Sequence, residues 1–314
     1  MSYNEYVGVA VLSYNSEKTI IETLESIKRQ TYRYLDLYIN DDCSSDKTVD
    51  LVNVWLRNNK NRFRKISLRT HSINQGINKS FDFILRQCET KWVKFIAADD
   101  LLMETCIEDN INYVITNKIE TLLYSYYHSF IEVNSKKITL KEDSFERHYL
   151  DKMGTYNPYK QYRLLLKKDI VFSPTGFINR DKYIELGGIT LEIKNIEDWP
   201  LRLLFTKNGE KIYVLKKYTI LYRIGNSVSH SNNQIYNIKH IKQTEDLKKL
   251  LIYPNISCFH LMYYFNEWLN SVRINIIVKV FKNRKTNFTY TINRFLMLFD
   301  MTKLVKGIYN LIYH

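Results

Sequence analysis

The chain has few cysteines, and it lacks the segments that carry a protein into or across a membrane. Its cysteines, Cys43, Cys88, Cys106 and Cys258, form no C-x-x-C pair, and none lies near a histidine at metal-ligand spacing. Nothing therefore suggests a zinc site or a disulfide framework, and a reducing compartment is indicated. The N-terminus carries no basic segment followed by an apolar one, so we expect no signal peptide. No apolar stretch reaches the roughly 18 residues that span a bilayer.

The chain also has fewer acidic than basic residues. Its 46 Lys and Arg outnumber 33 Asp and Glu and give a formal net charge of +13. Residues 232–314 carry +8 of this charge, with twelve Lys and Arg against four Asp and Glu. A basic segment of this kind indicates an anionic partner, such as a lipid headgroup, a phosphorylated substrate or nucleic acid. The 314 residues are 45% hydrophobic and 25% charged, which is typical of a globular chain of one large domain with an appendage or of two domains.

The first hundred residues alternate between strand and helix patterns. A continuous apolar run of the buried-strand type covers residues 7–12, and residues 35–39, 66–68 and 92–97, which are apolar except for Asp36, Ser67 and Lys94, predict three further strands. Apolar residues at helical spacing follow the first three runs, and Asn15 and Ser16 offer an N-cap for the first helix. This alternation predicts an α/β fold with a mainly parallel central sheet flanked by helices. The polar stretch 134–154 divides the two halves of the chain and predicts a flexible loop.

Asp99 and Asp100 are the most informative residues of the chain, because they directly follow a buried apolar run. Charged side chains are almost never buried unless they are paired or bound to a metal. Open α/β sheets bind their ligands at the carboxyl ends of the strands. A divalent cation that carries a diphosphate is the natural occupant of such a position. An acidic helix N-terminus is the alternative interpretation.

Two further polar clusters follow predicted strands. Residues 12–15 end the first strand, and residues 41–44 end the second. In a parallel sheet both clusters would lie at the same edge as Asp99 and Asp100. The sequence therefore predicts one polar, acidic edge that is able to hold a nucleotide and a metal ion.

These segments together carry a resemblance to a known family. The ordered motifs are VAVLSYN at 9–15, DDCSSD at 41–46, NQG at 74–76, ADD at 98–100, GG at 187–188, EDW at 197–199 and YR at 222–223. Over roughly residues 5–230 the chain resembles the inverting family-2 glycosyltransferases with the GT-A fold, of the bacterial polysaccharide type. The resemblance implies a glycosyltransferase domain at 1–231, with a nucleotide half at about 1–105 and an acceptor half at about 106–231. The basic, helical region 232–314 follows it.

The resemblance also implies a reaction. The enzyme would move a sugar, with inversion, from a nucleoside diphosphate sugar such as a UDP-sugar to a hydroxyl of a saccharide or lipid-linked saccharide acceptor. The transfer would depend on Mn²⁺ or Mg²⁺ and would serve the synthesis of a bacterial surface polysaccharide such as O-antigen.

By the same resemblance, the donor would contact a defined set of residues. This set is Leu12, Ser13, Tyr14, Asn15, Asp42, Asn74, Gly76, Lys79, Asp99 and Arg223. Tyr14 would lie against the base, and Asp42 would accept a hydrogen bond from it. The family carries an arginine after its Asn-x-Gly motif that is missing here, and Lys79 is the residue that would replace it. Arg223 would either pair with the diphosphate or bridge to a nearby carboxylate.

Metal ligands and a general base complete the implied site. Asp100 and Asp99 would bind the metal, and His230 would either complete a metal or phosphate site or lie in a surface loop. Asp198 would take a proton from the acceptor hydroxyl, with Glu197 as the second candidate. A positioned carboxylate suits this role, because an alcohol is a poor nucleophile and such a base typically gives about 10²–10⁴-fold. The pair also matches a helix start, which is compatible with catalysis.

The basic C-terminal region has an amphipathic pattern. One apolar stripe at helical spacing comprises Ile274, Ile277, Val278 and Phe281. A second stripe runs from 297 to 311, and Lys and Arg residues flank both. Basic amphipathic helices can lie in a membrane interface, so residues 270–314 predict a peripheral contact of a cytoplasmic protein with the inner face of the cell membrane. Packing on the catalytic domain or on a second subunit of a homo-oligomer is the alternative, and we expect no nucleic-acid partner.

Two rival functions share parts of this pattern. A sugar nucleotidyltransferase has a similar sheet and similar metal carboxylates, but it normally needs a glycine-rich phosphate loop, and the first turn at 13–16 contains no glycine. A non-catalytic GT-A-like scaffold that docks at a membrane is the other alternative. It would show no metal-linked binding of UDP.

Overall fold

Two units make up the chain, residues 1–224 and residues 225–314. The computed structural model describes residues 5–133, 136–140, 144–169, 173–225, 234–256 and 261–297. The domain boundary expected at residue 231 and the candidate ligand His230 both lie outside these described residues.

The four apolar runs of the N-terminal half form neighbouring parallel strands. Their bounds are β1 Val7–Ser13, β2 Leu35–Asp41, β3 Ile66–Thr70 and β4 Trp92–Ala97. β2 and β4 flank β1, and β3 lies outside β2. Both faces of β1 and β2 are buried, which explains why apolar residues dominate the sequences of both strands. The four predicted strands are confirmed.

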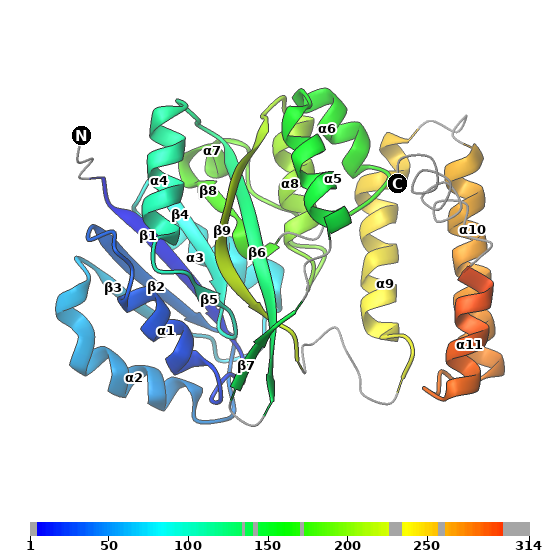
Figure 1. The fold of residues 1–314 in the computed structure, drawn as a ribbon, viewed down its shortest axis with the longest axis horizontal. Helices are drawn as coiled ribbons and strands as arrows, with labels where there is room; N and C mark the ends of the chain where they lie inside the picture. Colours follow the sequence, from blue (N-terminus) through cyan, green and yellow to red (C-terminus); the bar gives the residue numbers. More distant parts are fainter. Residues whose placement is uncertain are drawn as a thin grey trace. The chain divides into compact units, whose positions relative to one another are not determined.

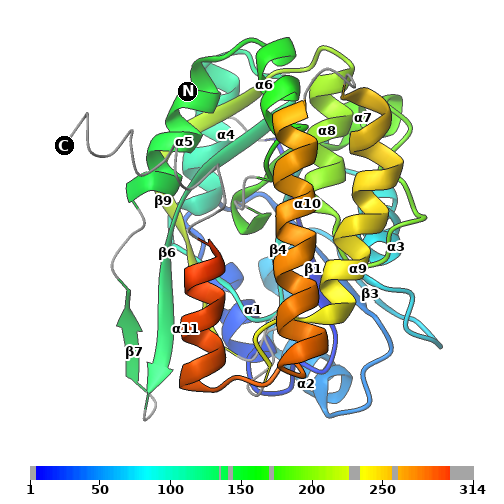
Figure 2. The same ribbon diagram turned by 90° about the vertical axis from the view of Figure 1, so that its right-hand side faces the viewer.

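The sheet continues past β4 with strands of mixed direction. Their bounds are β5 Leu101–Leu102, β6 Leu122–Val133, β7 Lys136–Thr139, β8 Phe177–Asn179 and β9 Ile212–Arg223. β8 joins β4 to β6 by antiparallel pairing, whereas β9 runs parallel to β6. The antiparallel β5 pairs with β9, and β7 lies beside the distal part of β6 (Figure 2). The mainly parallel sheet predicted from the sequence is therefore supplemented by short antiparallel strands.

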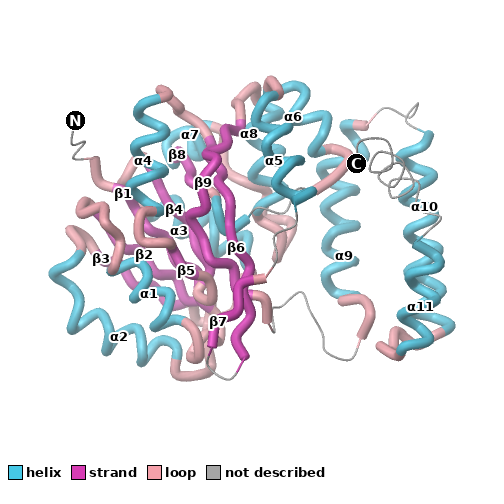
Figure 3. The backbone as a smooth tube through the Cα atoms, viewed as in Figure 1, coloured by secondary structure: helices cyan, strands magenta, loops and turns pink. Residues whose placement is uncertain are grey.

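Helices cover both faces of this sheet (Figures 1 and 3). The first four are α1 Ile20–Lys28, α2 Thr48–Asn59, α3 Ile77–Gln87 and α4 Cys106–Thr116. α1, α2 and α4 share one apolar core with β1, β2 and β4. α3 packs on the opposite face, where Phe81 meets Phe95 of β4 edge to face with ring centroids 4.8 Å apart. The result is a sheet held between two helical layers.

The first helix begins later than the sequence predicts. Thr19 precedes α1, so the N-cap expected at Asn15 or Ser16 is wrong. Asn15 instead adopts a left-handed backbone conformation with φ of 48°, and its side-chain oxygen accepts a hydrogen bond from the Ser45 amide at 2.9 Å. Asn favours such a conformation because its short polar side chain bonds locally. It therefore joins two loops rather than capping a helix.

The polar stretch 134–154 is not a loop, and that prediction is wrong. It contains β7 and most of α5. Leu150 and Met153 of α5 are buried, and an added Cβ on Gly154 would lie 2.9 Å from a methyl group of Val214 in β9. A few apolar positions at helical spacing, with a glycine that allows close approach, thus outweigh the polar composition of the stretch.

Further helices and turns complete the two units. In the first unit they are α5 Ser144–Thr155, α6 Pro158–Leu165, α7 Arg180–Glu185 and α8 Asp198–Lys207, with 3₁₀ turns at Lys60–Arg62 and Ser173–Thr175. In the second unit they are α9 Ile238–Leu247, α10 Leu261–Asn275 and α11 Asn287–Leu296, with π-helical segments at Lys248–Ile252 and Ile276–Val280 and a 3₁₀ turn at Tyr253–Asn255.

The second unit is helical, as predicted, and α9 and α10 lie side by side and run in opposite directions (Figure 2). Lys248 forms an ion pair with Glu267 of α10, and Ile277 of the first apolar stripe is fully buried. The second stripe lies beyond the described residues after Met297. None of the helices in the part of the chain that the structure describes is long and apolar enough to cross a membrane.

Candidate functional site

The carboxyl ends of β1, β2 and β4 meet at one edge of the sheet, as the sequence predicts. The amide of Ala98 donates to the carbonyl of Leu12 at 2.9 Å, and the amide of Asp42 donates to the carbonyl of Ser13 at 2.9 Å. Parallel pairing of β1 with both neighbours produces this arrangement. The segments that follow β2 and β4 are thus bonded to the last two residues of β1.

Asp41 shapes the turn at the ends of β1 and β2. Its buried carboxylate accepts hydrogen bonds from the hydroxyls of Ser13 at 2.9 Å and Ser44 at 2.6 Å, and from the Ser44 amide at 2.8 Å. The amide of Asn15 donates to the Ser44 hydroxyl at 2.8 Å. Tyr14, between these residues, is 47% exposed, so its ring is available to a ligand.

Asp42 holds the Asn-x-Gly motif against the end of β2. Its carboxylate accepts the amides of Gln75 at 2.7 Å and Gly76 at 2.9 Å, and the Asn74 side chain donates to its carbonyl at 3.2 Å. Gly76 has a φ of +85°, and a Cβ there would lie 2.7 Å from the Lys194 carbonyl. Only glycine fits such a position without strain. The role of Asp42 toward a nucleotide base stays a prediction.

Asn78 is a residue of this site that the sequence reasoning missed. It lies fully buried in the first turn of α3, and its side-chain amide exchanges two hydrogen bonds of 2.9 Å with the backbone of Ile196. The neighbouring Lys79 is exposed. Asn78 therefore ties the start of α3 to the segment that leads into Glu197 and Asp198. The sequence shows only a polar residue close to the Asn-x-Gly motif, and its burial is visible in the structure alone.

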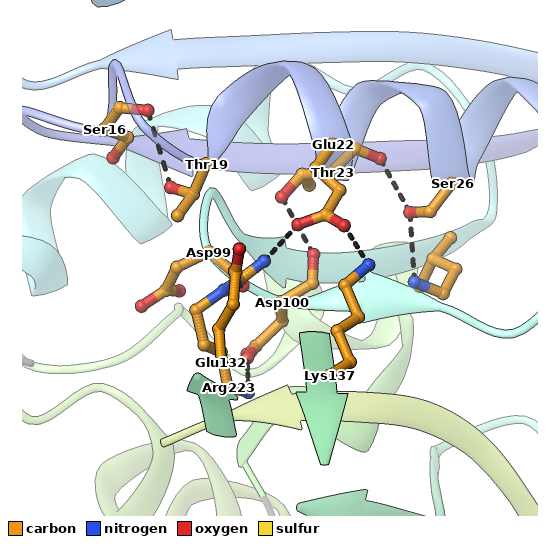
Figure 4. A network of polar contacts seen from close by, with 11 residues as sticks. Ser16, Thr19, Glu22, Thr23, Ser26, Asp99, Asp100, Glu132, Lys137 and Arg223 are labelled. Carbon is orange, nitrogen blue, oxygen red and sulfur yellow. Dashed lines mark hydrogen bonds and ion pairs between the residues drawn. The ribbon is translucent and has the colours of Figure 1, made fainter. Parts of the chain in front are cut away.

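Asp99 and Asp100 lie directly after β4 and bond to the end of β9 (Figure 4). Asp100 is 2% exposed, and its carboxylate accepts the amide of Arg223 at 2.9 Å. The carbonyl of Asp99 accepts the Arg223 Nε–H at 2.9 Å, and the Thr23 hydroxyl of α1 donates to the carbonyl of Asp100 at 2.8 Å. Helix α1 and strand β9 thus fix the conformation of this acidic step.

The electrostatics of the pair fit a divalent cation. Burial raises the pKa of both carboxyl groups, and the adjacent charge of Asp99 raises the pKa of Asp100 further, well above its ordinary value. A bound cation would favour the charged forms. Among the described residues no group of three or more His, Cys, Asp or Glu side chains is arranged to hold a metal ion. A cation that takes its remaining ligands from phosphate oxygens and water needs no more than one or two carboxylates.

Arg223 bridges carboxylates, which is one of the two alternatives expected from the sequence. Its guanidinium pairs with Glu132 of β6 at 2.6 Å and also with Glu22 of α1, to which Lys137 of β7 pairs as well (Figure 4). The guanidinium lies 4.7 Å from the centroid of the Phe130 ring. The other alternative, a contact with a diphosphate, stays a prediction.

Asp198 begins helix α8, and Glu197 occupies the N-cap position, so the predicted helix start is confirmed. One carboxylate oxygen of Asp198 accepts the Trp199 amide at 2.7 Å, and the other pairs with Arg202 at 3.1 Å. The Trp199 indole donates to the Leu165 carbonyl at the end of α6 at 2.9 Å. The position of the carboxylate is therefore set by its own helix and by the neighbouring α6.

Tyr222 lies next to Arg223 at the end of β9. Burial raises the pKa of Tyr222 to about 12, and the negative charges of Asp100, Asp99 and Asp198 contribute to that rise. Three carboxylates from distant parts of the sequence thus act on one phenol at the end of β9. Tyr222 is thus within electrostatic reach of the predicted metal ligands and of the predicted base, and the sequence reasoning included it in a motif but not among the site residues.

Comparison with known proteins gives a family match and curated relatives. The model of the family described as "Glycosyl transferase family 2" matches residues 8–187. WfaP of Escherichia coli, a UDP-Glc:alpha-D-GlcNAc-diphosphoundecaprenol beta-1,3-glucosyltransferase, is 28% identical over 128 residues, which cover 41% of this chain and 47% of WfaP. TarS of Staphylococcus aureus, a poly(ribitol-phosphate) beta-N-acetylglucosaminyltransferase, is 27% identical over 233 residues, which cover 72% of this chain and 37% of TarS. The chain thus spans less than half of the length of either relative.

Solved structures share the fold. The crystal structure of S. aureus TarS 1-349 matches with a TM-score of 0.58 and 19% identity, over 86% of this chain and 74% of that one. The mannosyltransferase PcManGT from Pyrobaculum calidifontis, in complex with GDP-Man and Mn²⁺, matches with a TM-score of 0.54 and 16% identity, over 77% of this chain and 61% of that one. These likenesses concern the fold alone, and they confirm the predicted fold class.

Proposed function

The chain belongs to glycosyl transferase family 2, and from this premise we propose that it transfers a sugar from a nucleoside diphosphate sugar to a hydroxyl group with inversion at the anomeric carbon. The observation that carries the proposal is the buried acidic step at Asp99 and Asp100, which contacts from Arg223 and Thr23 hold at the carboxyl ends of the parallel strands. Such a transfer needs both a charged site for a diphosphate and a base for the acceptor. A UDP-sugar is the proposed donor, since WfaP is named for UDP-Glc as its donor.

The donor would bind along the edge formed by the ends of β1, β2 and β4. Leu12, Ser13 and Tyr14 would border the base, and the exposed ring of Tyr14 offers a surface on which the base stacks. Asp42 would meet the base beside the Asn74–Gly76 turn that it holds.

Asp99 and Asp100 would hold Mn²⁺ or Mg²⁺ together with the diphosphate. A cation bound there supplies Lewis-acid stabilisation of the negative charge that develops on the leaving diphosphate. The residues of the chain contribute the position: Arg223 and Thr23 fix the backbone of the acidic step from β9 and α1.

Asp198 would act as the general base. As the acceptor oxygen attacks the anomeric carbon, its proton passes to the Asp198 carboxylate, and the bond between that carbon and the diphosphate oxygen breaks with its electron pair. One displacement inverts the anomeric carbon, so no protein nucleophile is needed. The Trp199 amide and Arg202 hold the carboxylate in place for this step.

The acceptor is proposed to be a bacterial surface polysaccharide or its lipid-linked precursor. The names of WfaP and TarS, which refer to a diphosphoundecaprenol-linked sugar and to poly(ribitol-phosphate), support this class. The net charge of +8 in residues 232–314 is compatible with an anionic acceptor or membrane surface. We place the enzyme at the inner face of the cell membrane, in peripheral contact through residues 270–314.

Calorimetric titration with UDP and Mn²⁺ tests the donor site. The wild-type chain should bind UDP with a heat that depends on Mn²⁺, whereas Asp100→Asn should lose this dependence because one ligand carboxylate is gone. Glu89→Gln is the matched control, since Glu89 is an exposed carboxylate at the opposite end of β4. Metal-independent binding by the wild type would contradict the metal assignment, and no UDP binding at all would support a non-catalytic scaffold.

Transfer from a panel of UDP-sugars tests the base. Asp198→Asn should bind UDP as the wild type does but lose about 10²–10⁴-fold in turnover, because its amide does not accept the proton. Glu185→Gln on α7, whose carboxylate pairs with Lys182 at the surface, is the control and should turn over normally. Normal turnover by Asp198→Asn would remove Asp198 from the mechanism.

A further inference from the structure

Arg202 is a fully buried arginine, one helical turn beyond the proposed base. Arginine is almost never fully buried unless it is paired, and a charge placed in the interior costs several kcal/mol before its partners are counted. The position carries no sequence signal, because a basic residue at this spacing is ordinary on a helix surface. The proposed reaction does not by itself explain why an arginine is fully buried at this position.

One nitrogen of this guanidinium pairs with two carboxylates. Arg202 Nη2 lies 2.5 Å from Asp169 Oδ1 and 3.1 Å from Asp198 Oδ2. The aromatic ring of Tyr124 on β6 lies 5.8 Å from the guanidinium carbon. Burial alone would lower the pKa of Arg202, but the charges of Asp198 and Asp169 outweigh it and raise the pKa, so the residue stays charged. One cation is thus shared between two anions.

The contacts with Asp198 come from two directions. The Trp199 amide holds Oδ1 at 2.7 Å, and Arg202 holds Oδ2 at 3.1 Å, so rotation of the carboxylate breaks one bond or the other. Each oxygen has two lone pairs, so one remains on each for an acceptor hydroxyl. The side chain of Asp198 retains 16% exposure, which leaves it reachable.

We propose that Arg202 and Asp169 are positioning residues for the base, such that Arg202 fixes the orientation of the Asp198 carboxylate while Asp169 draws away part of its positive charge. This inference rests on the proposed function of Asp198. A guanidinium paired with Asp198 alone would stabilise the carboxylate and make it a weaker base. The shorter contact to Asp169 limits that loss, so the pair orients the base without neutralising it.

The charged and titratable groups that face Asp198 come from several elements. They are Arg202 on its own helix, the adjacent Glu197, Asp169 after α6, Tyr124 on β6 and Tyr222 on β9. The two tyrosines are kept neutral by burial, which raises the pKa of each to about 12. Arg202 and Asp169 are therefore the pair whose removal changes the charge around the base in opposite directions.

The pH dependence of turnover, measured with the UDP-sugar that the panel identifies, tests the proposal. Arg202→Met removes a positive charge, so protonation of the base becomes easier and the acidic limb of the kcat profile should move to higher pH. Its kcat should fall by about 10²-fold because the carboxylate is no longer held, while UDP affinity stays unchanged. Asp169→Asn leaves the whole guanidinium to Asp198, so the same limb should move to lower pH.

Two further variants sharpen the comparison. Arg202→Lys keeps the charge and should restore the position of the limb with a partial recovery of kcat. Lys207→Met, which removes an exposed cation from the last turn of the same helix, should leave both the limb and kcat unchanged. The opposite signs expected for Arg202→Met and Asp169→Asn distinguish this proposal from a loss of folding, which would not move a limb.

Limbs that stay in place, or that move in the same direction in both variants, would overturn the proposal. If Arg202→Met does not fold, the direction of the shift in Asp169→Asn decides alone. Failure of the proposed function has a different signature, because Asp198→Asn would then turn over normally. An inactive Asp198→Asn combined with unmoved limbs would reject the positioning pair and leave the proposed function intact.

Discussion

Lys94 shows at the scale of a single residue how the sheet supports its functional edge. It is fully buried in β4, six positions before Asp100, and its ammonium donates to the carbonyls of Pro174 at 2.9 Å and Gly176 at 3.3 Å. Burial lowers the pKa of this lysine to about 8, against an ordinary value of 10.5. The Lys94 amine thus ties the Ser173–Thr175 turn to the sheet, and the free energy needed to bury it depends on pH.

The pH dependence of stability should reveal this buried amine. Between about pH 8 and 10.5 the unfolded chain holds the proton of Lys94 and the folded chain does not, so the free energy of unfolding gains a contribution that rises with pH across this window. Urea denaturation of the wild type and of Lys94→Met should therefore show the wild type gaining stability relative to the variant as pH rises. Lys91→Met, an exposed neighbour paired with Glu120, is the control. Parallel curves for wild type and Lys94→Met would contradict the expected shift.

Site residues could be predicted from the sequence where their signal is local. Asp99 and Asp100 follow an apolar run, and Asp198 stands before a helical turn, so a short window reveals each of them. Tyr222 and Arg202 gain their significance only from the pairing of β9 with β6 and from the end of α6. Such contacts depend on tertiary structure, and no local pattern encodes them.

At the scale of elements, the strands buried on both faces could be predicted from the sequence, whereas helix α5 in the polar stretch 134–154 could not. The run at Trp92–Ala97 is apolar except for Lys94 and gave the bounds of β4 without error. α5 is mostly polar, and its few buried residues pack against β9, more than fifty positions away. Amphipathic periodicity is weak in such a helix, so composition alone misleads.

Gly76 gives a prediction at this scale, because it starts α3 and closes the turn held by Asp42. Gly76→Ala combines an unfavourable φ with a Cβ 2.7 Å from the Lys194 carbonyl. We expect it to lower the free energy of unfolding by about 1–3 kcal/mol and to weaken UDP binding. Gly209→Ala is a matched control, since Gly209 has a φ of +83° with nothing within 4 Å of the added Cβ. Equal losses in both variants would show that the contact with Lys194 contributes nothing.

At the scale of the whole molecule, the described site residues all belong to the first unit, which ends at Ile224. That unit contains the complete sheet and its two helical layers. The second unit carries exposed aromatic side chains, including Trp268 at 58% and Phe288 at 67% exposure. The proposed donor site and the proposed membrane contact therefore fall in different units.

A chain that stops after Ile224 should keep UDP binding and lose vesicle binding. We expect it to fold and to bind UDP with Mn²⁺ as the full chain does, because no described site residue is lost. Only the full chain should sediment with vesicles that contain phosphatidylglycerol, and added salt should weaken that binding because the attraction is electrostatic. Equal sedimentation of both chains would contradict the role assigned to residues 270–314.

The contacts of Arg223 join segments that are synthesised at very different times. Glu22 and Arg223 are separated by 201 positions, yet they form an ion pair beside Asp99 and Asp100. Because translation proceeds from the N-terminus, Asp99 and Asp100 are synthesised long before Arg223, which contacts them in the folded protein. The nascent chain can therefore form this ion pair only after β9, the last strand of the first unit, has emerged, so the proposed donor site is completed late in the synthesis of that unit.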